Sequence, residues 1–550
     1  MNHISIFALG GLDENEKNCY VLEWNEKIFI INAGTKIPIN STNGIDTLIP
    51  NFDYLVKNKD RIQGIFISDV KSDTFSALPW LLMQIPNLKI YTSEFNKLMI
   101  LDRLSKYRIS NAAYKIFVLK DVKKFDDIFI QPIDIAGSMP GCLGFDFITP
   151  DGDVLFMFNF VEGNLGIYGK LSFDSLAKNF TKRKLLALVV DAGRVNLNGK
   201  AIEKIALPQS IKEVFLNAGP KERIIVSAYD EEMASIQQIL DLAYKTKRPV
   251  VTYGKTYGQV FELIRNTYSK LNWPNAIDYR NANKIPNAVV LVTGSINRLF
   301  SRFLRITEKN DVFLSLNAND NVLFLSPAVN GLEKLEALTL DEIAKVTSKI
   351  YDVSSSEFYR HRPARQDIID LVTKTKPQYV IPVEGLYRYL SDAQRYIAKE
   401  CKMKENQILV LQNGRIAHFI DGKLASSKGK VKEVGETIID GYGIGDISSE
   451  VVMEREVLGR EGVIVVSVLF DSKTKKLVSK IQINFVGSIS KEAKKDASEL
   501  IKQVILKILE EEKFANIKEL QNRARQVIKR KIFKNYDKEP LVVVTFQQIS

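Results

Sequence analysis

Histidine and cysteine are both scarce in this chain of 550 residues. There are three of each, namely His3, His361, His418, Cys19, Cys142 and Cys401. A metal centre built mainly from imidazoles is therefore nearly excluded, because such a centre needs several histidines close together. The cysteines lie far apart in the sequence, which argues against a disulfide framework and against a zinc site made of thiolates.

Long apolar runs and a basic leader are also missing. No stretch approaches the roughly 18 consecutive apolar residues that a membrane-spanning helix needs. The chain starts with MNHISIF and runs directly into an apolar strand pattern. We therefore expect no signal peptide, no membrane association and a cytoplasmic location.

The charge balance is basic. Lys and Arg number 77 against 65 Asp and Glu, which gives a formal net charge of +12. Such a surplus fits a polyanionic partner such as RNA, although a merely soluble basic protein carries similar charge. The 45% of apolar residues is ordinary for a globular protein, and the length predicts roughly three or four domains.

Short strands dominate the first part of the chain. Two strands are predicted at residues 20–24 and 28–31, and they flank Asn25 and Glu26 in a pattern typical of a hairpin. Residues 64–68 are predicted to form a buried apolar strand. A helix is predicted to open at 77–82, with a proline in its first turn. Further strands are predicted at 89–91, 128–135, 143–148 and 154–160.

From about residue 195 the pattern changes to strands that alternate with helices. Strands are predicted at 223–227, 250–252, 288–292 and 321–325, with helices at 231–244 and 257–269. This alternation favours a parallel sheet covered by helices. The next predicted elements are a helix at 365–375 and strands at 378–382, 408–411 and 416–420.

The last part of the chain follows a polar segment. Residues 426–432, SSKGKVK, have the composition of a linker. Strands are predicted at 462–470, 480–485 and 541–546, with helices at 491–513 and 517–533. These elements predict a compact α/β unit.

The segment GIFISDVKSDTFSALPWLL, residues 64–82, resembles the metal-binding segment of ribonuclease J, a metallo-β-lactamase enzyme of the β-CASP group. Other motifs follow in the order and spacing of that family: Gly10-Gly11-Leu12, Ala33-Gly34, Ile49–Leu55, Lys57–Arg61, Arg223–Val226, Thr293-Gly294-Ser295, Ile381-Pro382-Val383 and Asp440–Ile447. The resemblance therefore covers the whole chain.

The resemblance implies an α/β fold with three parts. These are a metallo-β-lactamase αββα sandwich, a β-CASP α/β domain inserted into it, and a small C-terminal α/β domain. The implied boundaries are 1–195 and 365–425 for the sandwich, 196–364 for the β-CASP domain, 426–448 for a linker and 449–550 for the C-terminal domain.

The residues that the family uses for metal binding are mostly replaced. In the family a His-x-His-x-Asp-His run helps to bind two Zn or Mn ions, which activate a water for attack on a phosphodiester. The corresponding positions here are Asp69, Lys71, Asp73 and Thr74, so that only one aspartate is kept. The remaining metal-binding positions are Gly137 and Glu384 for two histidines and Asn159 for the bridging aspartate, and Asp191 matches the first β-CASP motif of the family.

Family residues at the β-CASP positions are also replaced in this chain. A family histidine is replaced by Ala234, and the acids at 230–232 stand where the family seats a 5′-monophosphate. Three acids repel a phosphate, and we expect them to cap the following helix.

Basic residues occupy the loop that holds the RNA end in the family. Arg362 stands at the position of the catalytic histidine, and His361 is expected to be an ordinary loop residue. The cluster of Arg360, His361, Arg362 and Arg365 either grips a phosphate backbone or is a solvated basic loop. The same two interpretations apply to a helix near the C-terminus that carries Arg523, Arg525, Lys529, Arg530, Lys531 and Lys534.

We expect no bound metal. Asp69, Asp73 and Glu384 are the remaining oxygen donors for a Mg²⁺-like or Mn²⁺-like ion. The ammonium of Lys71 would stand where a ligand belongs, so an internal ion-pair network, for example Lys71 with Asp73, is the favoured interpretation.

The resemblance implies a role in RNA decay or processing. Our hypothesis is a catalytically impaired, RNA-associated subunit that pairs with an active ribonuclease J paralogue, or with itself as a dimer or tetramer. One alternative is an active metal-dependent 5′–3′ exo- or endoribonuclease rebuilt on Asp69, Asp73, Asp191 and Glu384. Another is a scaffold that makes no RNA contact.

Overall fold

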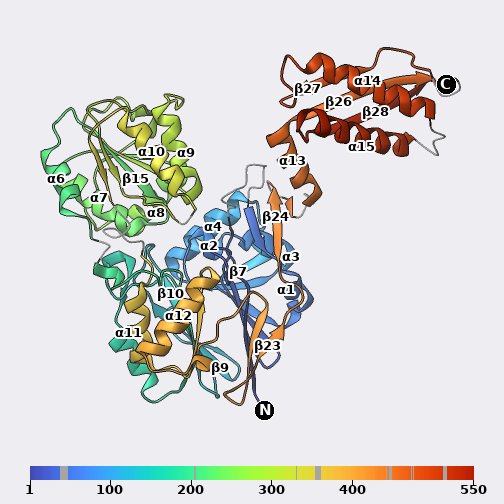
Figure 1. Cartoon of the computed structure of the whole chain (residues 1–550). Helices are drawn as coiled ribbons and strands as arrows, with labels where there is room; N and C mark the ends of the chain where they lie inside the picture. The colour runs from blue at the N-terminus through green and yellow to red at the C-terminus, as the bar shows by residue number, and fades with distance from the viewer. Residues whose placement is uncertain are drawn as a thin grey trace. The chain divides into compact units, whose positions relative to one another are not determined.

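The chain divides into two compact units (Figure 1). The computed structural model describes residues 1–36, 47–203, 206–329, 331–353, 361–440, 443–444, 449–471, 474, 476–511 and 517–549. The first unit comprises residues 1–39 and 47–437, and the second comprises 40–46 and 438–550.

The first unit contains two large sheets that pack against each other. The first has the order β23-β22-β1-β2-β3-β5-β6-β7. Its strands are β1 (His3–Gly10), β2 (Cys19–Trp24), β3 (Lys27–Ile31), β5 (Ile62–Phe66), β6 (Leu88–Thr92), β7 (Tyr114–Val118), β22 (Arg415–Ile420) and β23 (Lys423–Lys430). The second has the order β21-β14-β11-β10-β9-β8. Its strands are β8 (Lys123–Phe125), β9 (Ile128–Asp134), β10 (Leu143–Ile148), β11 (Asp153–Met157), β14 (Leu185–Asp191) and β21 (Tyr379–Val383).

A cluster of phenylalanines joins these two sheets. The ring of Phe66 lies 5.6 Å from that of Phe145 and 5.5 Å from that of Phe147, and Phe29 lies 5.6 Å from Phe147. All four side chains are fully buried, so the two sheets pack face to face.

Helices cover the outer faces of the sandwich. On the first sheet α4 (Glu94–Lys106) packs against β7 and against α3 (Leu78–Gln84). On the second, α11 (Arg365–Thr375) and α12 (Tyr387–Glu400) pack against β14 and β21, with α5 (Phe173–Ala177) beside α11 (Figure 1). The expected αββα arrangement is confirmed.

A third sheet is built from residues 224–352. Its order is β17-β16-β18-β15-β19-β20, and its neighbouring strands are parallel. The strands are β15 (Ile224–Tyr229), β16 (Val250–Tyr253), β17 (Ala276–Ile277), β18 (Val289–Gly294), β19 (Asn321–Phe324) and β20 (Ile350–Asp352). The helices of this region are α6 (Gln209–Asn217), α7 (Met233–Lys245), α8 (Lys255–Thr267), α9 (Ile296–Thr307) and α10 (Glu333–Ala344). The β-branched runs of the central strands are buried on both faces, as a helix-covered parallel sheet requires.

The second unit is a three-stranded sheet with helices. Its elements are α13 (Ser449–Glu461), β26 (Val463–Asp471), β27 (Gln482–Val486), α14 (Lys494–Glu511), α15 (Ile517–Tyr536) and β28 (Leu541–Ile549). β26 is antiparallel to β27 and parallel to β28. Alternate residues of β26 are buried against the helices, so one face of the sheet carries the core of this unit.

The remaining elements are short. They are α1 (Asp53–Lys57), α2 (Ser72–Phe75), β4 (Thr47–Pro50), β12 (Gly163–Asn164), β13 (Lys170–Leu171), β24 (Glu436–Asp440) and β25 (Gly443–Ile444), together with seven single turns of 3₁₀ helix: Lys59–Arg61, Asn111–Ala113, Gly166–Tyr168, Lys178–Phe180, Ala201–Glu203, Tyr279–Asn281 and Glu405–Gln407. Searching the described ranges for a helix with the length and hydropathy to cross a membrane finds none.

Two predicted elements differ in the structure. Residues 426–430, predicted as the start of the linker, belong to β23, because their backbone pairs with the edge strand β22 while their polar side chains face outward. Residues 408–411, predicted as a strand, make only an isolated bridge from Ile408 to Val380.

A buried acid pair on the second sheet predicts a pH-dependent stability. Arg183 lies 2.8 Å from Asp146 and 3.0 Å from Asp153, and both acids are almost fully buried. Burial, and then the Asp153 carboxylate, raise the pKa of Asp146 to about 8, although Arg183 opposes the shift. Between pH 4 and 8 the folded chain therefore holds a proton that the unfolded chain releases, so stability falls as the pH rises.

Replacing Asp146 with a neutral residue should remove this loss of stability at high pH. We expect Asp146→Asn to be more stable than wild type at pH 8 by about 1–3 kcal/mol and similar to it near pH 4. Urea unfolding across this pH range measures the difference, with Asp121→Asn at an exposed position as the control. A difference that does not grow with pH would contradict the assignment.

Candidate functional site

The predicted site residues that follow β5 lie together around the Asp69 carboxylate. Asp69 is 1% exposed. Its Oδ1 accepts hydrogen bonds from the Thr74 hydroxyl at 2.6 Å and from the backbone N–H of Lys71 at 3.0 Å. Its Oδ2 accepts hydrogen bonds from the Asn159 amide at 3.1 Å and from the Ser68 hydroxyl at 3.2 Å. The carboxylate is thus satisfied by neutral donors from its own loop and from Asn159.

The ammonium group of Lys71 is buried beside this carboxylate. The side chain is 2% exposed, and its Nζ lies 3.5 Å from Glu232 Oε1 and 3.5 Å from Asn159 Oδ1. A buried ammonium remains charged only where acceptors and a counter-ion surround it. Lys71 therefore supplies a positive charge inside the cluster of former ligand positions.

Arg362 supplies a second buried positive charge. Its guanidinium binds Asp191 with two hydrogen bonds, Nε to Oδ2 at 2.9 Å and Nη2 to Oδ1 at 2.6 Å. The same Nη2 donates to Glu384 Oε2 at 3.0 Å. Burial alone would lower the pKa of Arg362, but the carboxylates of Asp191 and Glu384 raise it, so the guanidinium is charged.

Two carboxylate oxygens in this cluster have no donor. Within the described part of the chain, Asp73 Oδ1 and Glu384 Oε1 are buried without a hydrogen-bond partner. Burial raises the pKa of Asp73 to about 6, with Lys71 opposing the shift and Glu231 and Asp69 adding to it. Burial and the Asp191 carboxylate likewise raise the pKa of Glu384 well above its usual range. The cluster thus has more carboxylates than its two cations neutralise.

The acids before α7 contact the sandwich, and the prediction that they cap this helix is wrong. Glu232 occupies the N-cap position without a side-chain cap bond. Its Oε2 lies 3.0 Å from His361 Nδ1, and its Oε1 is the partner of Lys71. Glu231 accepts a hydrogen bond from the backbone N–H of Ser72 at 2.7 Å. No local pattern in the sequence indicated this role, because Lys71 and His361 lie 161 and 129 positions from Glu232.

Backbone geometry restricts what these positions accept. Asn159 and Glu384 have positive φ angles of 47° and 61°, a conformation that asparagine tolerates more readily than glutamate. At Gly137 an added Cβ would lie 2.9 Å from Cys142 Sγ and 3.1 Å from the Asn159 carbonyl oxygen. The position where the family has a histidine is therefore closed to a larger side chain in this packing.

The four residues predicted to bind phosphate have different surroundings. His361 is 1% exposed and contacts Glu232, and Arg362 is bound to Asp191. Arg365 donates to the Val195 carbonyl at 3.0 Å and stacks over the ring of Tyr396 at 3.6 Å. Arg360 lies outside the described residues. Phosphate binding by this cluster remains a prediction, and the ion-pair role of Arg362 was missed.

The donor set does not fit a two-metal centre. No imidazole is present at the positions that correspond to the family's ligands, and the carboxylates of Asp69, Asp191 and Glu384 are bound to Arg362, to Thr74 or to amide donors. A search of the described residues finds no group of three or more His, Cys, Asp or Glu side chains arranged to hold a metal ion. Internal ion pairs join Lys71 to Glu232 and Arg362 to Asp191 and Glu384, whereas the pairing of Lys71 with Asp73 stays a prediction.

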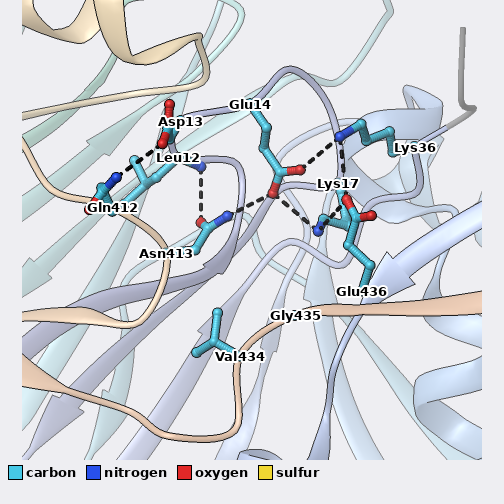
Figure 2. A pocket seen from close by; sticks show the side chains of 10 residues that line it. All are labelled: Leu12, Asp13, Glu14, Lys17, Lys36, Gln412, Asn413, Val434, Gly435 and Glu436. Atoms are coloured by element: carbon cyan, nitrogen blue, oxygen red, sulfur yellow. Dashed lines mark hydrogen bonds and ion pairs between the residues drawn. The ribbon is translucent and has the colours of Figure 1, made fainter.

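A separate cavity of about 410 Å³ lies beside the β1–β2 loop (Figure 2). Lys17 and Lys36 each contact both Glu14 and Glu436, at distances of 3.1 to 3.3 Å. Asn413 donates to Glu14 at 2.7 Å. The charges of this ring balance one another, and its ion pairs connect the β1–β2 loop to Lys36 and Glu436. No local pattern indicated that Glu436 would contact Lys17 and Lys36, which lie 419 and 400 positions away in the sequence.

The sandwich, the inserted parallel sheet and the altered site between them define a protein of the metallo-β-lactamase and β-CASP class. The family profile "Ribonuclease J, beta-CASP domain" matches residues 221–343, and "Ribonuclease J C-terminal domain" matches residues 450–549. The chain belongs to the ribonuclease J family.

Curated relatives match over the whole length. The chain is 28% identical to "Uncharacterized protein MG423" of Mycoplasma genitalium over 100% of both chains. It is 24% identical to "Ribonuclease J2" of Bacillus subtilis, over 100% of this chain and 99% of that protein. A solved structure, "Crystal Structure of a Protein of Unknown Function from Enterococcus faecalis V583", covers 76% of this chain and 100% of its own with a TM-score of 0.50 and 12% identity, which supports the fold alone.

Proposed function

We propose that this protein acts in RNA decay or processing as a catalytically impaired, RNA-associated subunit. Its similarity to proteins named ribonuclease J2 supports the RNA-related role. The subunit would pair with an active ribonuclease J paralogue or with a second copy of itself.

The observation that carries this proposal is the pair of buried cations at the former active site. Lys71 and Arg362 stand at positions where the family has histidines; Lys71 pairs with Glu232, and Arg362 pairs with Asp191 and Glu384. Hydrolysis of a phosphodiester needs an activated water and a means to stabilise the developing negative charge. A carboxylate that is bound to a guanidinium is a weak base, so Asp191 and Glu384 are poorly suited to activate water.

The same contacts give the cluster a structural task. Lys71 with Glu232 and Ser72 with Glu231 join the sandwich to the start of α7, and the Ala234 N–H donates to the Ser138 carbonyl at 3.0 Å. These interactions tie the parallel-sheet region to the sandwich. The residues thus maintain the arrangement of the two regions, which preserves an RNA-associated surface without hydrolysis.

A cleavage assay tests the loss of activity. Purified full-length protein is incubated with 5′-monophosphorylated RNA and added Mn²⁺, Mg²⁺ or Zn²⁺, alongside Asp73→Ala. We expect no cleavage above the Asp73→Ala background. An active ribonuclease J under the same conditions controls for the substrate and the metals.

The second candidate function is an active nuclease with a rebuilt carboxylate site, using Asp69, Asp73, Asp191 and Glu384. The buried oxygens of Asp73 and Glu384 without donors favour it. Metal-dependent cleavage that disappears in Asp73→Ala would establish this candidate and refute the first.

Association is tested separately with the wild-type protein. The main proposal requires binding to RNA or to an active ribonuclease J paralogue, and it fails if neither is bound. Partner binding that is insensitive to salt and to RNA removal would instead identify a scaffold without RNA contact.

A further inference from the structure

The positive charge of the second unit is concentrated on one helix. α15 carries seven Lys and Arg residues and a single acid, Glu519. The rest of residues 438–550 contains thirteen basic and fifteen acidic residues. The basic character of this unit therefore belongs to α15 and is not a general property of its surface.

The inner side of α15 fixes the helix in place. Leu520, Ala524, Ile528 and Ile532 are buried in the core of the second unit, and α15 packs against β28 (Figure 1). This apolar stripe is fully used inside the unit, so it is not available to insert into a lipid surface as an amphipathic membrane helix would. The basic side chains must lie on the remaining side.

These basic side chains form two rows on the exposed side. The helical period places Arg523, Arg530 and Lys534 in one row. It places Lys518, Arg525 and Lys529 in the other. All six are exposed, and about 24 Å of helix separates the first of them from the last. Because the inner side of the helix is packed in the core, these charges have a fixed spacing along which a phosphate backbone could bind.

Lys529, in the second row, has an acid nearby. Lys529 lies 3.8 Å from Glu539, and both side chains are at least half exposed, so this pair contributes little. Neighbouring α14 differs, since its lysines alternate with acids such as Asp496 and Glu499. Mixed charge of that kind is typical of a solvated face, whereas seven of the eight charged residues on α15 are basic.

Other exposed groups on this side fit a nucleic acid. Phe533 is 50% exposed, and the amides of Asn522 and Gln526 are exposed between the basic rows. Amides donate to phosphate and ribose oxygens, and an exposed aromatic ring stacks on an unpaired base. The combination of cations, amides and one aromatic ring matches single-stranded RNA.

We propose that the exposed side of α15 binds the backbone of RNA without sequence preference. This inference rests on the proposed function and names a second RNA contact, separate from the loop that carries Arg362. Binding of this kind is driven by counter-ion release and therefore weakens steeply with salt.

The test compares two triple variants of the full-length protein. One is Lys529→Gln/Arg530→Gln/Lys534→Gln on α15. The matched control is Lys480→Gln/Lys491→Gln/Lys495→Gln, which removes the same charge from exposed positions elsewhere in the unit. Fluorescence anisotropy with a labelled single-stranded RNA is recorded over a range of salt concentrations.

We expect the α15 variant to bind at least about tenfold more weakly, with a salt slope smaller by about 2. The control should stay within about twofold of wild type, since its positions lie outside the two rows. A Lys529→Arg/Arg530→Lys variant, which keeps the charge, should retain the wild-type slope.

The outcomes separate the two proposals. Equal affinities and slopes for both triple variants would overturn RNA binding by α15 while wild-type RNA binding still supports the proposed function. If wild type binds no RNA, the α15 inference fails, and the proposed function then depends on association with a ribonuclease J paralogue. A stronger preference of the wild type for anionic lipid vesicles over RNA would also overturn the inference.

Discussion

Arg362→Ala should lower the free energy of unfolding by about 3–5 kcal/mol. The substitution leaves Asp191 and Glu384 buried without the guanidinium that holds both. An uncompensated buried carboxylate costs far more than the loss of one exposed ion pair. Urea unfolding of the full-length protein, followed by tryptophan fluorescence and circular dichroism, measures the shift of the transition.

A neighbouring arginine serves as the control for this result. Arg365 contacts a backbone carbonyl and the ring of Tyr396, so Arg365→Ala should cost only about 1 kcal/mol. Arg362→Lys should lose an intermediate amount of stability, because an ammonium keeps the charge but cannot form the bidentate hydrogen bonds of the guanidinium. Equal midpoints for the two alanine variants would show that Arg362 does not stabilise the site.

Phe66→Ala should destabilise the sandwich by a similar amount, about 3–5 kcal/mol. The ring of Phe66 is fully buried and stacks on Tyr91 at 4.9 Å while it faces Phe145 and Phe147 of the opposite sheet. Removing it leaves a cavity between two sheets whose strands are held in register and cannot collapse easily. The same urea experiment measures the effect.

Phe117→Ala is the matched control for the sandwich. Phe117 stacks on the same Tyr91 at 5.2 Å but is 38% exposed, so its removal opens no closed cavity. We expect a cost near or below 1 kcal/mol. If both phenylalanine variants lose the same stability, the packing between the sheets is not the main source of stability in this region.

The strands and the family fold could be predicted from the sequence, because apolar periodicity and turn residues act locally. The hairpin at 20–31 and the strand–helix alternation after residue 195 are confirmed by the antiparallel and parallel pairings. Helix α12 was not predicted, although its buried residues Tyr389, Leu390, Ala393 and Ile397 recur at helical spacing. Strand β23 escaped because a polar edge strand has the composition of a linker.

The site was predictable only in part. The sequence identified which residues stand at the former ligand positions and indicated an ion-pair network. It did not indicate that Glu232, from a distant helix, would neutralise Lys71, or that Arg362 would turn inward to Asp191. Such pairings depend on tertiary distances between residues more than 150 positions apart, and no local pattern encodes them.

The closed packing around Gly137 has a consequence for redesign of the site. A histidine placed there alone would collide with Cys142 and the backbone of Asn159. A histidine placed at position 71 or 362 alone would leave Glu232, or Asp191 and Glu384, without their cation. Each of these single substitutions toward a metal site is therefore expected to give a less stable protein, so such a site could be installed only by several changes made together.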